Sequence, residues 1–175
     1  FPLFRCSLPY SGRIHSVGAV LIVWHVTFDV KQSIAGLLHD IATPVFAHVV
    51  DFMKGDHLKQ ESTEEYTRKL IEESEGIQKV LHKYGLSTED VADYHRYPIA
   101  DNDSPGLSAD RLEYTLGNFY CREKKSLGEI RRIYRNLTTV LNEEGIPVLA
   151  FTSSEEALTF TLGSLDNSSM FTADE

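Results

Sequence analysis

A histidine and an aspartate stand side by side in this chain, at the end of an apolar segment. His39 and Asp40 follow the run Ile34-Ala35-Gly36-Leu37-Leu38, whose spacing predicts a short helix with one apolar face. We expect the pair to be half-buried there, and a buried carboxylate is costly unless a cation or hydrogen bonds compensate it. A divalent metal ion is the usual compensation when two more ligands come from elsewhere. His15 and Asp110 are the residues that we expect to supply them.

The chemistry of this ligand set is that of a hydrolase. Two imidazoles and two carboxylates that leave open coordination positions suit Mn, Fe, Co, Ni, Zn or Mg. Such an ion lowers the pKa of a bound water and neutralises phosphate charge, so metal-assisted hydrolysis of a phosphoester is the predicted reaction.

Helices must position these ligands. His15 lies in the nearly all-apolar stretch 14–27, which predicts a buried helix. Asp110 follows Ser108, a typical N-cap residue. Capping residues and apolar spacing predict helices over about 14–27, 31–39, 44–53, 63–73, 76–84, 88–97, from 109 through 116, 127–142 and 154–165. Residues 146–151 read as a short strand or an extended link, and the fold class is therefore all-α.

Composition limits the classes of partner. The chain has 175 residues, which predicts one domain over 1–175, with 121–175 as a C-terminal helical extension. Its net charge is −9 and its 17 Lys and Arg are scattered, which argues against nucleic-acid binding. An acidic protein can still bind a phosphorylated small molecule where a metal ion and a few arginines line the pocket.

Cysteine usage and hydropathy favour a cytoplasmic protein. Cys6 and Cys121 form no disulfide framework, which suits a reducing compartment. The longest apolar run, 17–24, is far shorter than the ~18–20 residues that span a bilayer, and no signal peptide precedes it. Because the chain starts at Phe1 without a Met, we expect an upstream segment to be missing. The oligomeric state stays open, a homo-oligomer included.

Three segments resemble one protein family. His39-Asp40-Ile41-Ala42-Thr43-Pro44-Val45-Phe46-Ala47-His48 resembles the motif of the HD-domain phosphohydrolases. It is most similar to their deoxynucleoside triphosphate triphosphohydrolase branch, whose motif continues into Pro-Phe-x-His. The segments His15-Ser16-Val17-Gly18 and Asp110-Arg111-Leu112-Glu113-Tyr114 resemble the first and last motifs of that branch. The resemblance covers about residues 10–120, and it implies an HD-like helical bundle with a metal ion on His15, His39, Asp40 and Asp110.

The resemblance also implies roles around the metal. Candidates for proton transfer as catalytic residues are Asp51, His48 and Glu61. Candidates for substrate binding are the phosphate-screening arginines Arg13 and Arg111, with Tyr114 near the sugar.

Three phosphate-facing positions depart from the branch. A His after the HD pair is replaced by Ala42-Thr43, an Arg before the first His by Gly12, and the His of a later His-Glu pair by Gln60. The predicted function is therefore a metal-dependent phosphohydrolase acting on a nucleotide or related phosphorylated molecule. The alternatives are a deoxynucleoside triphosphate triphosphohydrolase, and a metal- and nucleotide-binding module without turnover.

Each ligand also has a purely structural explanation. His39-Asp40 fits a helix C-terminus with a capping Asp, and His15 fits a core histidine with a satisfied ring. Asp110 fits an acid in a first helical turn, where the helix dipole favours it. Packing alone would explain Tyr114, and helix-end or cap positions would explain Asp51 and Glu61.

Overall fold

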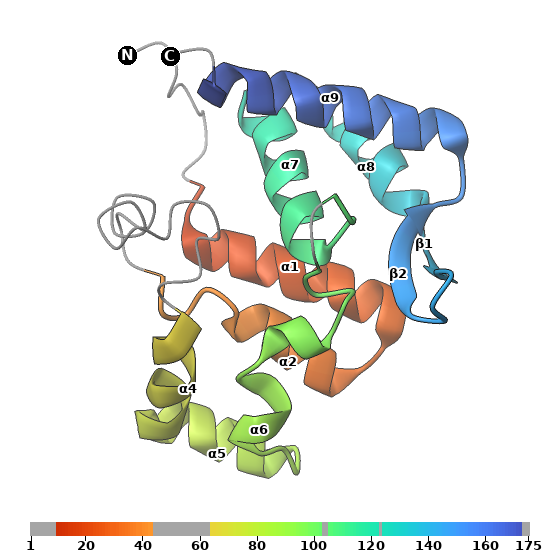
Figure 1. Ribbon diagram of the computed structural model, residues 1–175. Helices are drawn as coiled ribbons and strands as arrows, with labels where there is room; N and C mark the ends of the chain where they lie inside the picture. The colour runs from red at the N-terminus through yellow and green to blue at the C-terminus, as the bar shows by residue number, and fades with distance from the viewer. Residues whose placement is uncertain (1–9, 44–63, 103–104, 123, 173–175) are drawn as a thin grey trace.

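The computed structural model describes residues 10–43, 64–102, 105–122 and 124–172, and this part is mostly helical (Figure 1). It contains eight α-helices and one short antiparallel hairpin. The elements are α1 (Gly12–Thr27), α2 (Val30–Leu38), α4 (Glu64–Glu73), α5 (Glu75–Lys83), α6 (Thr88–Val91), the 3-10 turn η2 (Tyr94–Arg96), α7 (Ala109–Cys121), α8 (Leu127–Arg135), β1 (Leu137–Leu141), β2 (Pro147–Phe151) and α9 (Ser154–Thr172). The predicted helical fold class is confirmed. None of the helices described is long and apolar enough to cross a lipid bilayer.

Capping residues set the starts of the helices that carry the site. Ser11 precedes α1 and its side chain accepts a hydrogen bond from the Ile14 amide. The Asp29 carboxylate accepts from two amides of the first turn of α2. Ser108 accepts from the Arg111 amide at the start of α7, as predicted. Each side chain satisfies an amide that has no partner within its own helix.

Helix α1 packs between α2 and α7 (Figure 1). Its buried face carries His15, Ala19, Ile22 and Val23, which recur at helical spacing. The opposite face is open, because Ile14, Val17, Leu21 and Trp24 are each 42–57% exposed. The prediction of a buried helix is therefore right for one face only, since the other face stays exposed.

Two clusters of buried side chains form the core. The larger one joins α1, α7, α8, the hairpin and α9, and includes Val23, Leu112, Phe119 and Ile133. The smaller one joins α2, α4, α5 and α6 through Ala35, Ile71, Leu81 and Val91.

The hairpin corrects one helix prediction. Residues 127–142 are amphipathic and predict one helix, yet α8 ends at Arg135 and 137–141 form β1. The sequence of β1, Leu-Thr-Thr-Val-Leu, is rich in β-branched residues, which favour strands. Register runs from Leu137 opposite Phe151 to Leu141 opposite Pro147. Of the two alternatives for residues 146–151, the strand is therefore confirmed, as β2.

Other boundaries differ modestly from the predictions. The helix expected over 88–97 ends at Val91, and η2 follows as a separate turn. The last helix continues past residue 165 to Thr172. Helix α5 matches its prediction, and Gly85 follows it with a φ of +67°. The helix expected over 44–53 lies outside the described residues.

Candidate metal centre

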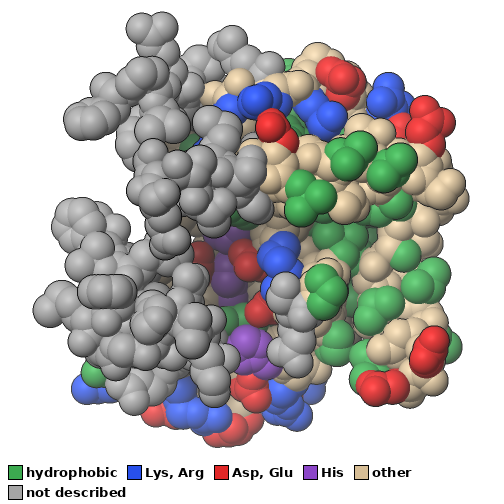
Figure 2. All heavy atoms as spheres, turned by 45° about the horizontal axis from the view of Figure 1, so that its top comes forward, with side chains coloured by type: hydrophobic (Ala, Val, Ile, Leu, Met, Phe, Trp, Pro, Cys, Tyr) green, Lys and Arg blue, Asp and Glu red, His purple; other side chains and the backbone are tan. Residues whose placement is uncertain are grey.

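Three helices bring His15, His39 and Asp110 together. His15 lies in the first turns of α1, His39 is the C-cap residue of α2, and Asp110 lies in the first turn of α7. The two Nε2 atoms are 3.3 Å apart, and Asp110 Oδ1 lies 2.8 Å from that of His15 and 3.4 Å from that of His39. Ligand atoms of the three residues all lie within 4.8 Å of one another, which makes them a possible metal site. Figure 2 shows histidine and acidic side chains together in a recess of one face.

Asp40 lies at the edge of this cluster. Its Oδ2 is 3.7 Å from His15 Nε2 and 3.5 Å from His39 Nε2. The Thr43 hydroxyl donates a hydrogen bond of 3.0 Å to Asp40 Oδ1, which leaves Oδ2 facing the histidines. All four residues predicted as metal ligands therefore meet in one place.

The second nitrogen of each histidine ring has its own partner. His39 Nδ1 donates to the Gly36 carbonyl at 2.7 Å, and His15 Nδ1 donates to Glu113 Oε2 at 2.5 Å. Carbonyl and carboxylate oxygens only accept, so the Nδ1 atoms carry hydrogen. The Nε2 atoms are then the metal-binding positions, and both point at the cluster.

The charges of the cluster favour a cation or protons between its members. The side chains of His15 and His39 are 10% and 7% exposed. Burial lowers the pKa of His15, but the hydrogen bonds and charges of Asp110 and Glu113 outweigh it and raise that pKa to about 10. Burial also lowers the pKa of His39. The hydrogen bond to Asp110 and the charges of Asp40 and Asp110 outweigh this effect, so the pKa of His39 is raised. Burial raises the pKa of Asp110. The hydrogen bonds and charges of His15 and His39 lower it more strongly, so it falls well below its usual range.

This donor set fits a divalent metal ion. Two imidazole nitrogens and carboxylate oxygens within 2.8–3.7 Å of one another need positive charge between them, and the protein alone can supply it only as protons. Imidazole and carboxylate ligands together suit the middle transition metals and Zn.

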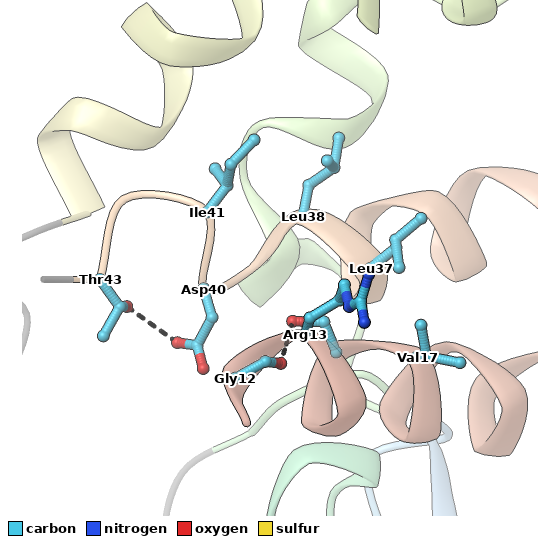
Figure 3. Close-up of a pocket in the computed structure, with 9 residues that line it drawn as sticks. Gly12, Arg13, Val17, Leu37, Leu38, Asp40, Ile41 and Thr43 are labelled. Carbon is cyan, nitrogen blue, oxygen red and sulfur yellow. Dashed lines mark hydrogen bonds between the residues drawn. The ribbon is translucent and has the colours of Figure 1, made fainter. Parts of the chain in front are cut away.

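A pocket adjoins the cluster between α1 and the end of α2 (Figure 3). Its volume is about 590 Å³. Apolar and polar side chains line it together, among them Val17, Leu37, Ile41, Arg13, Asp40 and Thr43. Asp40 thus faces both the histidines and the pocket.

The residues predicted to bind substrate have different surroundings. Arg13 lines the pocket beside Asp40. Arg111 instead holds the loop that precedes α7, because its Nε donates to the Gly106 carbonyl at 2.9 Å and its Nη2 donates to Asn102. Tyr114 lies one turn after Asp110 and is 47% exposed. Binding of substrate by any of the three stays a prediction.

The residues predicted to transfer protons, Asp51, His48 and Glu61, lie outside the described residues.

Sequence reasoning missed two residues behind His15, namely Glu113 and Tyr10. Glu113 had a signal, because it stands three positions after Asp110 and hence on a neighbouring part of the same helix face. Tyr10, which precedes the first predicted helix, had none.

Comparisons with known proteins give two relatives. An uncharacterised protein of Bacillus subtilis, YdhJ, is 35% identical over 107 residues, which are 61% of this chain and 32% of that protein. The metal-dependent phosphohydrolase cns2 of Cordyceps militaris is 27% identical over 123 residues, 70% of this chain and 35% of that protein. The chain thus spans about a third of the length of these relatives. No protein-family model and no solved structure matches it.

These findings agree with the geometry of the site. The segment shared with the phosphohydrolase covers most of the chain, and the chain places two histidines and an aspartate where one metal ion can reach all three. The chain is a distant homologue of a protein named as a metal-dependent phosphohydrolase, and it holds two buried histidines and a part-buried aspartate in one cluster.

Proposed function

We propose that this cluster is the metal centre of a phosphohydrolase that acts on a nucleotide or a related phosphorylated small molecule. One observation carries the proposal. Both histidines have Nδ1 engaged in hydrogen bonds, and both Nε2 atoms face aspartate oxygens in a buried site. Such an arrangement orients two imidazoles for one ion, whereas a core histidine needs only one satisfied partner.

His15, His39, Asp40 and Asp110 would hold the ion. A divalent ion bound there lowers the pKa of its water ligand and neutralises phosphate charge. The protein contributes the dry surroundings of the two rings and the pocket that orients the substrate.

The pocket favours an organic phosphate as the substrate. The Arg13 guanidinium supplies positive charge to the pocket that Asp40 also lines, and guanidinium groups bind phosphate well. Val17 of α1 and Leu37 of α2 line the same pocket and are 45% and 37% exposed. They offer an apolar surface to a base or another organic group. The name of the Cordyceps relative supports hydrolysis, and the nucleotide is part of the proposal.

Metal content is the first test. We would purify the chain without added metal or chelator and measure its metal by elemental analysis. About one transition metal ion per chain is expected in the wild type and none in Asp110→Ala. Asp166→Ala is the matched control, because Asp166 is an exposed acid on α9 that pairs with Lys124. Absence of metal from the wild type, with refilling by Mn²⁺ or Co²⁺ also failing, would contradict the proposal.

Product analysis then separates the candidate functions. With Mn²⁺ or Co²⁺ present, release of inorganic phosphate from a nucleotide supports the proposed reaction. Release of tripolyphosphate from a deoxynucleoside triphosphate would identify the triphosphohydrolase alternative. Thermal stabilisation by nucleotide without any product would identify a binding module.

A further inference from the structure

A carboxylate outside the expected ligand set lies directly behind His15. Glu113 stands one turn after Asp110 on α7, and its side chain is 12% exposed. Burying such a group is costly without hydrogen bonds. Its Oε2 accepts one from His15 Nδ1 at 2.5 Å and another from the Tyr10 hydroxyl. The result is a chain of hydrogen bonds from Tyr10 through Glu113 to the metal-facing ring.

Tyr10 can act only as a donor in this chain. Burial, with the adjacent Glu113 carboxylate, raises the pKa of the Tyr10 hydroxyl far above its ordinary value, so it keeps its proton. Its ring rests on α7 at Gly117, where an added Cβ would lie 2.8 Å from the ring carbons and hydroxyl oxygen. A larger residue at this position would push the tyrosine away from Glu113.

A second glycine makes room for Glu113 itself. The Glu113 side chain crosses α1 at Gly18, where an added Cβ would overlap its Cγ, Cδ and Oε1 atoms. Gly18 stands three positions after His15, on the same helix face. Glycine inside a helix costs about 0.5–1 kcal/mol relative to alanine. Gly18 and Gly117 each allow a close approach by a member of the same hydrogen-bond chain.

We propose that Glu113 is the positioning residue of the metal centre: it fixes the His15 ring so that Nε2 faces Asp110 and the ion. Tyr10 and Gly18 hold Glu113 in that place. This inference rests on the proposed function, since it presumes that the cluster binds a metal ion. His39 is positioned differently, because its Nδ1 donates to the backbone carbonyl of Gly36. Loss of Glu113 should therefore release one ring and leave the other in place.

Metal affinity tests the inference without any measurement of activity. The whole, metal-stripped chain is titrated with Co²⁺, and binding is followed by visible absorption. We expect Glu113→Ala to bind Co²⁺ about 10–100-fold more weakly, as is usual when the partner of a ligating histidine is removed. Glu113→Gln should lose less, because its amide oxygen still accepts the Nδ1 hydrogen. Gly18→Ala should weaken binding with Glu113 intact.

Two matched controls separate positioning from stability. Glu129→Ala removes a glutamate that completes the capping box of α8, and should lower stability without changing Co²⁺ affinity. Gly128→Ala adds a Cβ to a helix where the nearest atom is 3.8 Å away, and should leave the affinity unchanged. If Glu113→Ala does not fold, Glu113→Gln and Gly18→Ala carry the same comparison.

The proton on His15 gives a second measurement. In the Zn²⁺-loaded wild type, both histidines should show hydrogen-bonded Nδ1–H resonances by NMR. Glu113→Ala should lose that of His15 and keep that of His39. A Glu113→Ala protein with unchanged Co²⁺ affinity and an intact His15 resonance would overturn this inference and leave the metal centre standing. A wild type that binds neither Co²⁺ nor Zn²⁺ would overturn both.

Discussion

Arg13 and Arg111 carry the same charge but have different surroundings. Arg13 is exposed and lines the pocket that Asp40 also lines, whereas Arg111 donates to backbone and side-chain oxygens of the loop before α7. A free guanidinium next to a metal site can bind phosphate, while one whose donors are used holds the fold together. Positive charge next to the two resemblance motifs made both arginines substrate candidates, and only the folded loop separates them.

At the pocket, Arg13→Ala should weaken substrate binding. We expect KM for a phosphorylated substrate to rise about tenfold, which corresponds to ~1.4 kcal/mol, with metal content unchanged. Arg13→Lys should recover part of the loss because it keeps the charge. The control is Arg131→Ala, which removes an exposed arginine on α8. An unchanged KM in Arg13→Ala would show that the pocket does not receive the phosphate.

In the loop, Arg111→Ala should act on stability. It removes hydrogen bonds to Gly106 and Asn102, and we expect the free energy of unfolding to fall by about 1–3 kcal/mol. Urea denaturation followed by circular dichroism measures it, with Arg131→Ala again as the control. Unchanged stability together with a higher KM would return Arg111 to the substrate site.

At the scale of elements, capping residues predicted the starts of helices well, whereas features that depend on contacts between elements were missed. The starts of α1, α2 and α7 lie close to the predicted positions, because a cap acts on amides two or three residues away. The end of α8 was missed, since an amphipathic helix and a strand pair compete over Leu137–Leu141 and the partner strand decides. Glu113 was missed for a similar reason. Its contact with His15 exists only once α7 has packed on α1.

The contact between α7 and α9 depends on Gly163. A Cβ at this position would lie 2.5 Å from the ring of Phe119, which is 1% exposed in the larger core cluster. Gly163→Ala should therefore cost about 1–3 kcal/mol of unfolding free energy, as overpacking does. Gly128→Ala should not destabilise, since its Cβ meets no close neighbour. Urea midpoints of the two variants test this, and equal midpoints would contradict it.

For the whole molecule, the site lies where the two core clusters meet. His15 and Asp110 belong to the helices of the larger cluster, and His39 ends α2, whose Ala35 packs in the smaller one. A metal ion held by all three would link the two clusters. Such a contribution cannot be deduced from any single stretch of sequence, because it depends on how the helix groups pack.

Metal should therefore stabilise the complete fold. At a free metal concentration of about 100 times Kd, binding adds ~2.7 kcal/mol to the free energy of unfolding. We expect Zn²⁺ or Co²⁺ to raise the Tm of the stripped wild type in a concentration-dependent way. Asp110→Ala should show no such rise, and Asp166→Ala should behave as the wild type. A rise that persists in Asp110→Ala would locate the bound ion elsewhere.

The ligands of the centre are widely spaced along the chain. His15, His39 and Asp40 precede Asp110 by the whole of α4, α5 and α6. During synthesis on the ribosome, the first three are therefore exposed to the cell before the fourth has been made. High-affinity capture of the ion must wait until α7 has emerged and docked on α1, so metal loading would report the docking of α7, a step that comes before α8, the hairpin and α9 have been made.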